Sequence, residues 1–152
     1  MRGVLARHNV HRCMHSAPPL RWSSALEADA KQWAAMGRGQ RSPPFLLQNV
    51  AGFAQVGENT GVDYPDPGGD RSPSGAVTHW YDQVTQTRRG AVDHFDRRWS
   101  AYTQVVWRST THVGCGWHHG FIVCHYGLGG NVDGQYSSQV NERQKSQSEC
   151  MR

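Results

Sequence analysis

The sequence lacks two features that would fix its class at once, namely a long apolar stretch and closely spaced cysteine pairs. No run of about 18 apolar residues occurs, so no transmembrane segment is expected. The N-terminus also lacks the apolar core of a signal peptide, so we expect a mature form that begins with an added Met1. The four cysteines contain no C-x-x-C pair, which favours disulfide bonds over zinc fingers.

Lysine and acidic residues are scarce, and positive charge is spread along the chain. Only 18% of the residues are charged, the net charge is +4, and two of the sixteen basic residues are lysines. The arginines occur as singles and pairs, such as Arg88-Arg89 and Arg97-Arg98. Because nucleic-acid-binding proteins concentrate such charge on one face, we expect a solvated surface and no nucleic-acid partner.

Glycine and proline are abundant, and the chain shows no internal repeat. Seventeen glycines and seven prolines in 152 residues indicate long loops rather than a helical bundle. The length suits one domain. We therefore expect a single domain over residues 1–152, with its core at about 4–136 and a polar, loosely held tail at 137–152.

Apolar periodicity predicts three helices. The first covers residues 4–15. The second begins at Ser24, which forms a capping-box pattern with Glu27, and it ends at Gly37. The third is capped by Ser74.

Strand signals are clearest late in the chain. Residues 101–107 fit either a strand, because of their valines, or one face of a helix. Residues 113–117 and 121–126 predict a hairpin around the turn His118-His119-Gly120.

The pairing of the four cysteines is open from their number alone, because three combinations exist. Counting outward from the hairpin turn places Cys115 and Cys124 on one face, at diagonal positions. We therefore expect a disulfide between them, although Cys13 is a rival partner. Cys150 is expected to pin the polar tail.

Several motifs occur in an order that resembles one known family. They are His8-Asn9-x-x-Arg12, Pro19-Leu20-x-Trp22, Gly57-Glu58-Asn59, Ala76-Val77-x-x-Trp80-Tyr81, Tyr102-Thr103-Gln104-Val105-Val106-Trp107, Val113-Gly114-Cys115-Gly116 and Phe121-Ile122-Val123-Cys124-His125-Tyr126. Any one motif is weak, but together they resemble the cysteine-rich secretory, antigen 5 and pathogenesis-related (CAP) superfamily. Among its members, the sequence looks most similar to secreted fungal and plant pathogenesis-related proteins.

The resemblance implies an α/β fold, namely a three-layer α-β-α sandwich with long loops. It assigns residues 101–107 to a helix rather than a strand. It also implies a secreted, extracellular protein, which we expect to be a monomer.

Most well-known members carry two histidines and two glutamates around a central cleft, and some bind zinc there. The resemblance places Glu58 at one of these positions. The other three positions fall on Gln83, on Ala101 and near Gln48. Because alanine donates no lone pair and glutamine lacks the charge, we expect neither a metal at this cleft nor a cofactor. Glu58 is expected to accept hydrogen bonds from the backbone of a loop.

His79 and Asp82 form a weaker alternative metal site. They lie at positions i and i+3 of the third predicted helix, a spacing that permits joint coordination. An ordinary polar role is nevertheless the favoured interpretation for each of the nine histidines.

Four aromatic residues, Trp80, Tyr81, Tyr102 and Trp107, fall on inward faces of predicted helices. Such rings usually build a core, but they also line apolar ligand grooves. Because members of the family bind sterols, fatty acids or related lipids, the resemblance favours a ligand groove at these residues.

We therefore expect a non-enzymatic binding protein for a sterol or fatty acid, acting in host–microbe interaction or defence. A hydrolase is disfavoured, because no nucleophile with an adjacent base is evident. The alternative is a module that binds an extracellular protein through its long loops at residues 38–56 and 61–74.

The missing ligands predict weak zinc binding at the family cleft. Isothermal titration at neutral pH should detect no tight site, and Glu58→Ala should change the result little, because a lone carboxylate holds zinc poorly. Tight zinc binding that Glu58→Ala abolishes would contradict this prediction.

Overall fold

The computed structural model describes residues 1–66 and 68–152. Its centre is a four-stranded sheet in the order β1–β7–β8–β4, in which β1 runs parallel to β7 and the other neighbours are antiparallel. These strands are β1 (Arg21–Trp22), β4 (Gly57–Val62), β7 (His112–His118) and β8 (Phe121–Gly127). Since β4 has only one neighbour, it forms an edge of the sheet.

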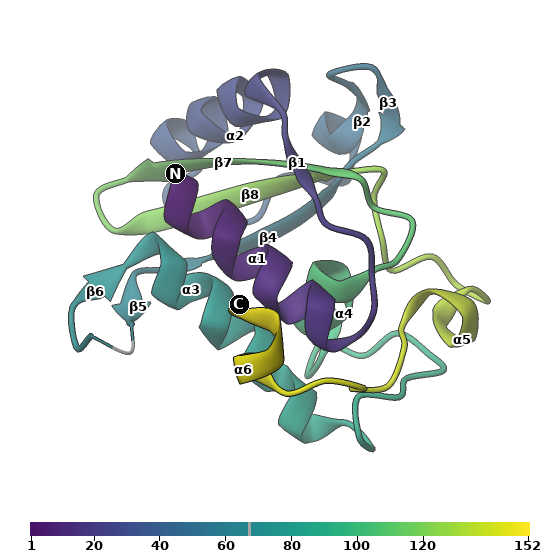
Figure 1. Ribbon diagram of the computed structural model, residues 1–152. Coiled ribbons are helices and arrows are strands. Elements are labelled where there is room, and N and C mark those ends of the chain that lie inside the picture. The colour runs from purple at the N-terminus through teal and green to yellow at the C-terminus, as the bar shows by residue number, and fades with distance from the viewer. Residues whose placement is uncertain (67) are drawn as a thin grey trace.

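Helices cover both faces of this sheet (Figure 1). On one face lies α2 (Ser24–Met36), whose Ala30 and Ala34 pack with Val123 of β8. The other face is covered by α1 (Arg2–Met14), α3 (Pro73–Tyr81) and α4 (Ser100–Val106), which share the larger apolar core with the sheet. The expected three-layer α-β-α sandwich is confirmed.

The long loops contain short elements of their own. Loop 38–56 holds the 3-10 helix η1 (Pro44–Leu47) and the hairpin of β2 (Gln48–Val50) with β3 (Phe53–Gln55). Loop 61–74 holds the hairpin of β5 (Tyr64–Pro65) with β6 (Arg71–Ser72), and its residue 67 lies outside the described residues. The remaining elements are η2 (Asp82–Gln86), α5 (Tyr136–Gln139) and α6 (Gln147–Cys150). No helix in the described ranges is long and apolar enough to cross a bilayer.

The ambiguous segment 101–107 is helical. It forms α4 up to Val106, as the family resemblance implies, and Tyr102, Val105 and Val106 are buried in the main core. Helical spacing brings these apolar side chains onto the sheet, whereas the alternation of a strand would expose some of them.

The caps of two helices lie one or two residues before their predicted positions. Ser23 rather than Ser24 caps α2, and Ser72 rather than Ser74 caps α3. Each hydroxyl accepts a hydrogen bond from a backbone N–H three residues on, at 3.1 Å. A capping residue is the last non-helical one, and Pro73 suits the first helical position because that position needs no N–H donor.

The late hairpin turns over two residues rather than three. His119 and Gly120 have φ values of 48° and 80°, as this type of two-residue turn requires. The shorter turn places Cys115 directly opposite Cys124, with their Cα atoms 4.1 Å apart. The predicted disulfide is therefore confirmed, but the diagonal placement was wrong.

The polar tail is held firmly against α1, not loosely as predicted. Cys150 forms a disulfide with Cys13, and the backbone N–H of Gln144 donates to the carbonyl of Met14 at 2.8 Å. The carbonyl of Asn141 also lies 2.7 Å from His15 Nδ1. Apolar content was the wrong criterion here, because backbone hydrogen bonds and a covalent bond order this segment.

The first-helix motif is a structural tie between distant segments. Arg12 is fully buried, and its guanidinium donates five hydrogen bonds to backbone carbonyls at 2.7–3.4 Å. The acceptors belong to Pro18, Val105, Trp107, Arg108 and Thr110. Burial lowers the pKa of Arg12 to about 10, so the group stays charged at neutral pH.

Three buried histidines lie in or directly after α1, namely His8, His11 and His15. His8 Nε2 lies 2.8 Å from the Tyr126 hydroxyl, and His15 Nε2 lies 2.9 Å from the Tyr81 hydroxyl. His11 stacks on Tyr81 with ring centroids 4.0 Å apart, and its nitrogens find no hydrogen-bond partner among the described residues. Burial lowers the pKa of His8 to about 4 and of His11 to about 3, and it also lowers the pKa of His15.

Arg12→Lys should lower the free energy of unfolding by about 3 kcal/mol, because an ammonium cannot replace the planar donors of a buried guanidinium. Denaturant unfolding measures this loss. Arg21→Lys, at an exposed position of β1, is the matched control and should leave the stability unchanged. A small effect of Arg12→Lys would contradict the structural role of the guanidinium.

The buried histidines predict that acid destabilises the fold. Their folded-state pKa values lie below the ordinary value of 6.5, so the unfolded chain takes up protons first. The stability is fully present above pH 6.5 and is lost as the pH falls toward the folded-state values. His11→Phe keeps the stack on Tyr81 and removes one titrating group, so it should reduce the loss near pH 4 by about 3 kcal/mol.

Unfolding curves at several pH values test this prediction. The exposed His118 supplies the control, because His118→Phe removes an imidazole that is already hydrated. An equal pH dependence in His11→Phe and in the unmodified protein would show that His11 does not cause the acid sensitivity.

Candidate functional site

The residues at the four family metal positions do not converge. Gln83 and Ala101 line a cavity beside β4, whereas the Glu58 carboxylate binds Ser42 and His125, and Gln48 is exposed in β2. The amide of Gln83 and the methyl group of Ala101 are not zinc ligands, and the carboxylate of Glu58 already binds other side chains. This set of groups does not suit zinc. Within the described ranges, no group of three or more His, Cys, Asp or Glu side chains could hold a metal.

Gln83 has a structural task that explains its place at the cavity. Its Oε1 accepts hydrogen bonds from the backbone N–H groups of Ala101 at 2.9 Å and Tyr102 at 3.1 Å. The amide oxygen is therefore engaged in holding the start of α4. The amide nitrogen is the remaining group that can donate to a ligand.

The cavity lined by Gln83, which we call the arginine cavity, has a volume of about 370 Å³. Arg41 and Arg97 both line it, and neither forms an ion pair or a hydrogen bond among the described residues. Among the described residues, its lining includes no aspartate or glutamate. The full lining is Arg41, Asn59, Thr60, Gly61, Val62, Tyr64, His79, Trp80, Gln83, Arg97, Ser100 and Ala101. Its charge is therefore positive, opposite to that of a metal cleft.

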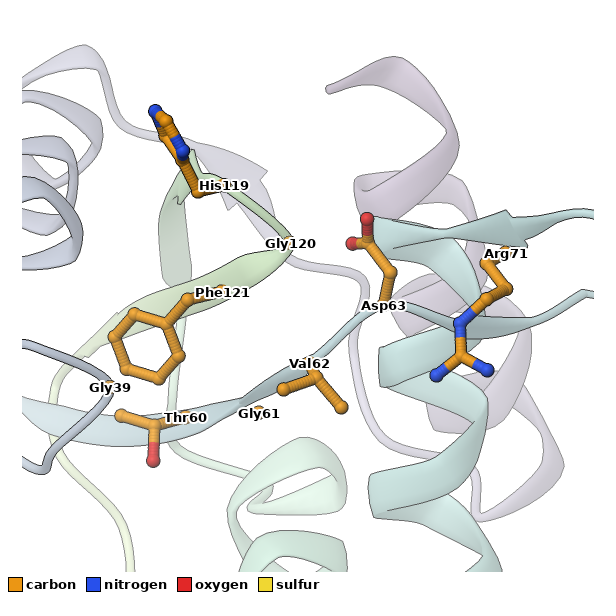
Figure 2. A pocket seen from close by; sticks show the side chains of 9 residues that line it. All are labelled: Gly39, Thr60, Gly61, Val62, Asp63, Arg71, His119, Gly120 and Phe121. Atoms are coloured by element: carbon orange, nitrogen blue, oxygen red, sulfur yellow. The ribbon is translucent and has the colours of Figure 1, made fainter.

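A second cavity, the hairpin cavity, adjoins the first along β4 and has a volume of about 460 Å³. The two cavities share Thr60, Gly61 and Val62, so together they follow the edge of the sheet. Figure 2 shows the Phe121 ring near the Thr60 side chain, Val62 further along β4, and Asp63 and Arg71 toward the other end. This cavity adds the ring of Phe121 to the apolar surface beside β4.

Glu58 belongs to a buried polar cluster, as expected from its structural role, but two of its partners were not predicted. Glu58 Oε1 accepts from the Ser42 backbone N–H at 2.7 Å, and Oε2 accepts from the Ser42 hydroxyl and lies 2.7 Å from His125 Nε2. Asp29 Oδ2 lies 2.7 Å from the other nitrogen, His125 Nδ1. Burial favours a higher pKa for Glu58, but the hydrogen bonds from His125 and Ser42 outweigh it and lower the pKa.

His125 and Asp29 carry no sequence signal that connects them. His125 occupies a strand position next to Cys124, and Asp29 lies on α2, almost a hundred positions earlier. Only the packing of α2 on β8 brings the two side chains together.

The four aromatic residues of the expected ligand groove lie mainly in the core. Trp80, Tyr81, Tyr102 and Trp107 are exposed by only 3%, 5%, 0% and 1%. Trp80 also lines the arginine cavity and donates from Nε1 to the Thr60 carbonyl at 3.1 Å. Tyr81, Tyr102 and Trp107 are therefore core residues. Trp80 is the one of the four that lines a cavity.

The alternative metal pair, His79 and Asp82, is poorly suited to a cation. His79 stacks on Tyr64 with ring centroids 3.7 Å apart. Burial raises the pKa of Asp82, although His79 opposes this effect, and a raised pKa weakens a carboxylate as a ligand. The described part of the chain supplies no third ligand beside them.

Comparison with known proteins identifies relatives of this chain. Residues 5–126 match the model of the cysteine-rich secretory protein (CAP) family. A probable pathogenesis-related protein of Candida albicans is 34% identical over 145 residues, covering 90% of this chain and 63% of that protein. A secreted protein, RBT4, of the same organism is 30% identical over 138 residues, covering 86% of this chain and 35% of that protein.

Solved structures have the same fold. The structure of Schistosoma mansoni venom allergen-like protein 4 covers 99% of both chains with a TM-score of 0.64 and 24% sequence identity. The chain spans 63% or less of the length of the two Candida albicans relatives. The family model matches most of the chain, and its motifs occupy the positions that build the sandwich. The chain belongs to the cysteine-rich secretory protein (CAP) family.

Proposed function

We propose that this protein is a secreted, non-enzymatic binding protein, and that its ligand is a small amphiphile with an anionic head, a fatty acid rather than a sterol. The observation that carries the proposal is the pair of arginines, Arg41 and Arg97, which line one cavity with neither an ion-pair partner nor an acidic side chain of the lining among the described residues. The two disulfides and the relative named a secreted protein support an extracellular location.

The arginine cavity suits a carboxylate head. A guanidinium presents several N–H donors in a plane that matches the two oxygens of a carboxylate. The Gln83 amide nitrogen adds a further donor, because Gln83 Oε1 already accepts from the backbone of α4. Arg41 and Arg97 are exposed. A carboxylate can pair with both charges and a sterol hydroxyl cannot, so the cavity favours an anion.

The hairpin cavity suits the apolar part of such a ligand. It continues from the arginine cavity through Thr60, Gly61 and Val62, and Phe121 provides a ring at its wall. Gly61 lets the Trp80 indole pack closely against the edge strand at this boundary, because a Cβ there would lie 3.0 Å from Trp80 Nε1. An extended chain of modest length can thus run along the edge strand.

The polar cluster around Glu58 supports a non-catalytic role. Ser42 donates its hydroxyl to Glu58, not to His125. The pKa of Glu58 is lowered, so this carboxylate is a weak base for activating a serine. The cluster therefore lacks the serine–histidine contact that nucleophilic catalysis requires.

A second function, binding of an extracellular protein through loop 38–56, is favoured by one observation. Phe45 and Leu46, both in η1 of this loop, are 71% and 42% exposed. Exposed apolar side chains on a loop are typical of contact surfaces.

A titration with a fluorescent fatty acid tests the proposed ligand. Binding should be saturable and should weaken about tenfold in the double variant Arg41→Ala/Arg97→Ala, because the carboxylate loses two partners. Arg21→Ala is the control, since Arg21 is exposed but lies outside both cavities. Competition with unlabelled fatty acid establishes specificity.

Two outcomes would contradict this proposal. Saturable binding of a labelled sterol without fatty-acid binding would reverse the preference for an anionic head. Absence of binding to either lipid would favour the protein-binding function, and Phe45→Ser would then be the first variant to examine for loss of a partner.

A further inference from the structure

Three exposed apolar side chains gather where the end of α2 meets η1. Phe45, Met36 and Leu46 are 71%, 60% and 42% exposed. Met36 and Leu46 line the same small cavity, and Phe45 directly precedes Leu46 in η1. In Figure 1, the loop with β2 and β3 lies at the periphery of the molecule, in the same upper part of the view as α2. We call Met36, Phe45 and Leu46 the apolar patch.

The loop that carries most of the apolar patch has positive charge only. Loop 38–56 contains two charged residues, Arg38 and Arg41, and no aspartate or glutamate. Both arginines are exposed, and neither forms an ion pair among the described residues. Asp29 of α2 lines the neighbouring cavity, where its carboxylate is paired with His125 at 2.7 Å. The rim of the patch is therefore positive.

The backbone is fixed on both sides of η1, although the side chains of the patch are exposed. Before η1, the Ser42 backbone N–H donates to Glu58 at 2.7 Å. After it, the Val56 backbone N–H donates to the Leu47 carbonyl at 2.9 Å. Two consecutive prolines at the start of η1 restrict the backbone further. The patch therefore loses little backbone freedom when it contacts a partner.

We propose that the apolar patch docks the protein on the surface of an anionic lipid bilayer. Its three side chains enter the boundary between headgroups and acyl chains, and Arg38 and Arg41 lie at the level of the anionic headgroups. A bilayer presents negative charge with an apolar layer directly beneath it, which is the combination that the patch and its rim match. This inference does not depend on the proposed fatty-acid site, although Arg41 borders both.

The chemistry of the patch favours a bilayer over a protein partner. Protein interfaces surround an apolar centre with a polar rim whose hydrogen bonds fix the orientation of the partner. The side chains of η1 contain no polar group, and the charges of its loop have one sign. Such a surface selects negative charge and apolar depth rather than a particular shape.

Cosedimentation with lipid vesicles tests the proposed docking. Vesicles of phosphatidylcholine with about one third phosphatidylserine should bind the protein about tenfold more tightly than vesicles of phosphatidylcholine alone, because anionic headgroups attract both arginines. Added NaCl should weaken the binding to the mixed vesicles, since salt screens exposed charges.

Phe45→Ser should weaken binding to the mixed vesicles about tenfold, because the variant no longer transfers an aromatic ring from water to the bilayer. Phe95→Ser is the matched control. Phe95 is 47% exposed, lies outside the apolar patch and has Asp93 and Asp96 as near neighbours in the chain, so its loss should leave binding unchanged.

A second variant tests the charge of the rim. Arg38→Asn should weaken binding to the mixed vesicles about fivefold, because one positive charge near the surface is lost. Asparagine tolerates the φ of 50° at this position. Arg89→Asn is the matched control, since Arg89 is also exposed and has a φ of 57°. Arg41 is left unchanged because it also lines the arginine cavity.

Fatty-acid titration without vesicles separates this inference from the proposed ligand. Phe45 and Arg38 line neither the arginine cavity nor the hairpin cavity, so both variants should bind fatty acid as the unmodified protein does. Vesicle binding that both variants weaken and both controls preserve supports the docking. The inference is overturned if the mixed vesicles do not bind, if phosphatidylcholine alone binds equally well, or if the controls weaken binding as much as the variants. Absence of vesicle binding would assign the patch to the protein-binding function instead.

Discussion

The Arg12 guanidinium is the interaction on which the arrangement of the helices depends. It joins the link after α1, the end of α4 and the turn that leads into β7, all through backbone carbonyls. Every residue has a backbone carbonyl, so these hydrogen bonds of Arg12 do not depend on which side chains the accepting residues carry. No carboxylate accompanies this buried charge among the described residues. The free-energy cost of burying it is offset because each N–H group of the guanidinium donates to a backbone carbonyl.

The start of α4 forms one wall of the arginine cavity beside β4, and the residues there help to set the charge of that cavity. Gln83 holds the start of α4 through its amide oxygen, and the small side chain of Ala101 lines the cavity beside it. The remaining charges at the cavity are those of Arg41 and Arg97. The cavity beside β4 is therefore positive, because a few side chains set its charge and the backbone does not.

The two faces of the sheet differ in polarity near β4. On the side of α2, the Glu58 carboxylate is surrounded by Ser42 and His125, with Asp29 behind the imidazole. On the side of α3, the edge strand borders the arginine cavity. Alternation along β4 produces this division, because successive side chains of a strand point to opposite faces.

The sequence by itself determined the late hairpin and the Cys115–Cys124 bond, because hairpin pairing is local. The layers of the sandwich were implied by the resemblance of its motifs to one family and not by local periodicity. It misplaced the caps of α2 and α3 by one or two residues, since neighbouring serines are equivalent until the backbone bends at one of them. Only the tertiary structure decided that the tail is ordered, that Tyr102 and Trp107 fill the core, and that Asp29 meets His125. These contacts join residues far apart in the chain, and no local pattern encodes which surfaces pack together.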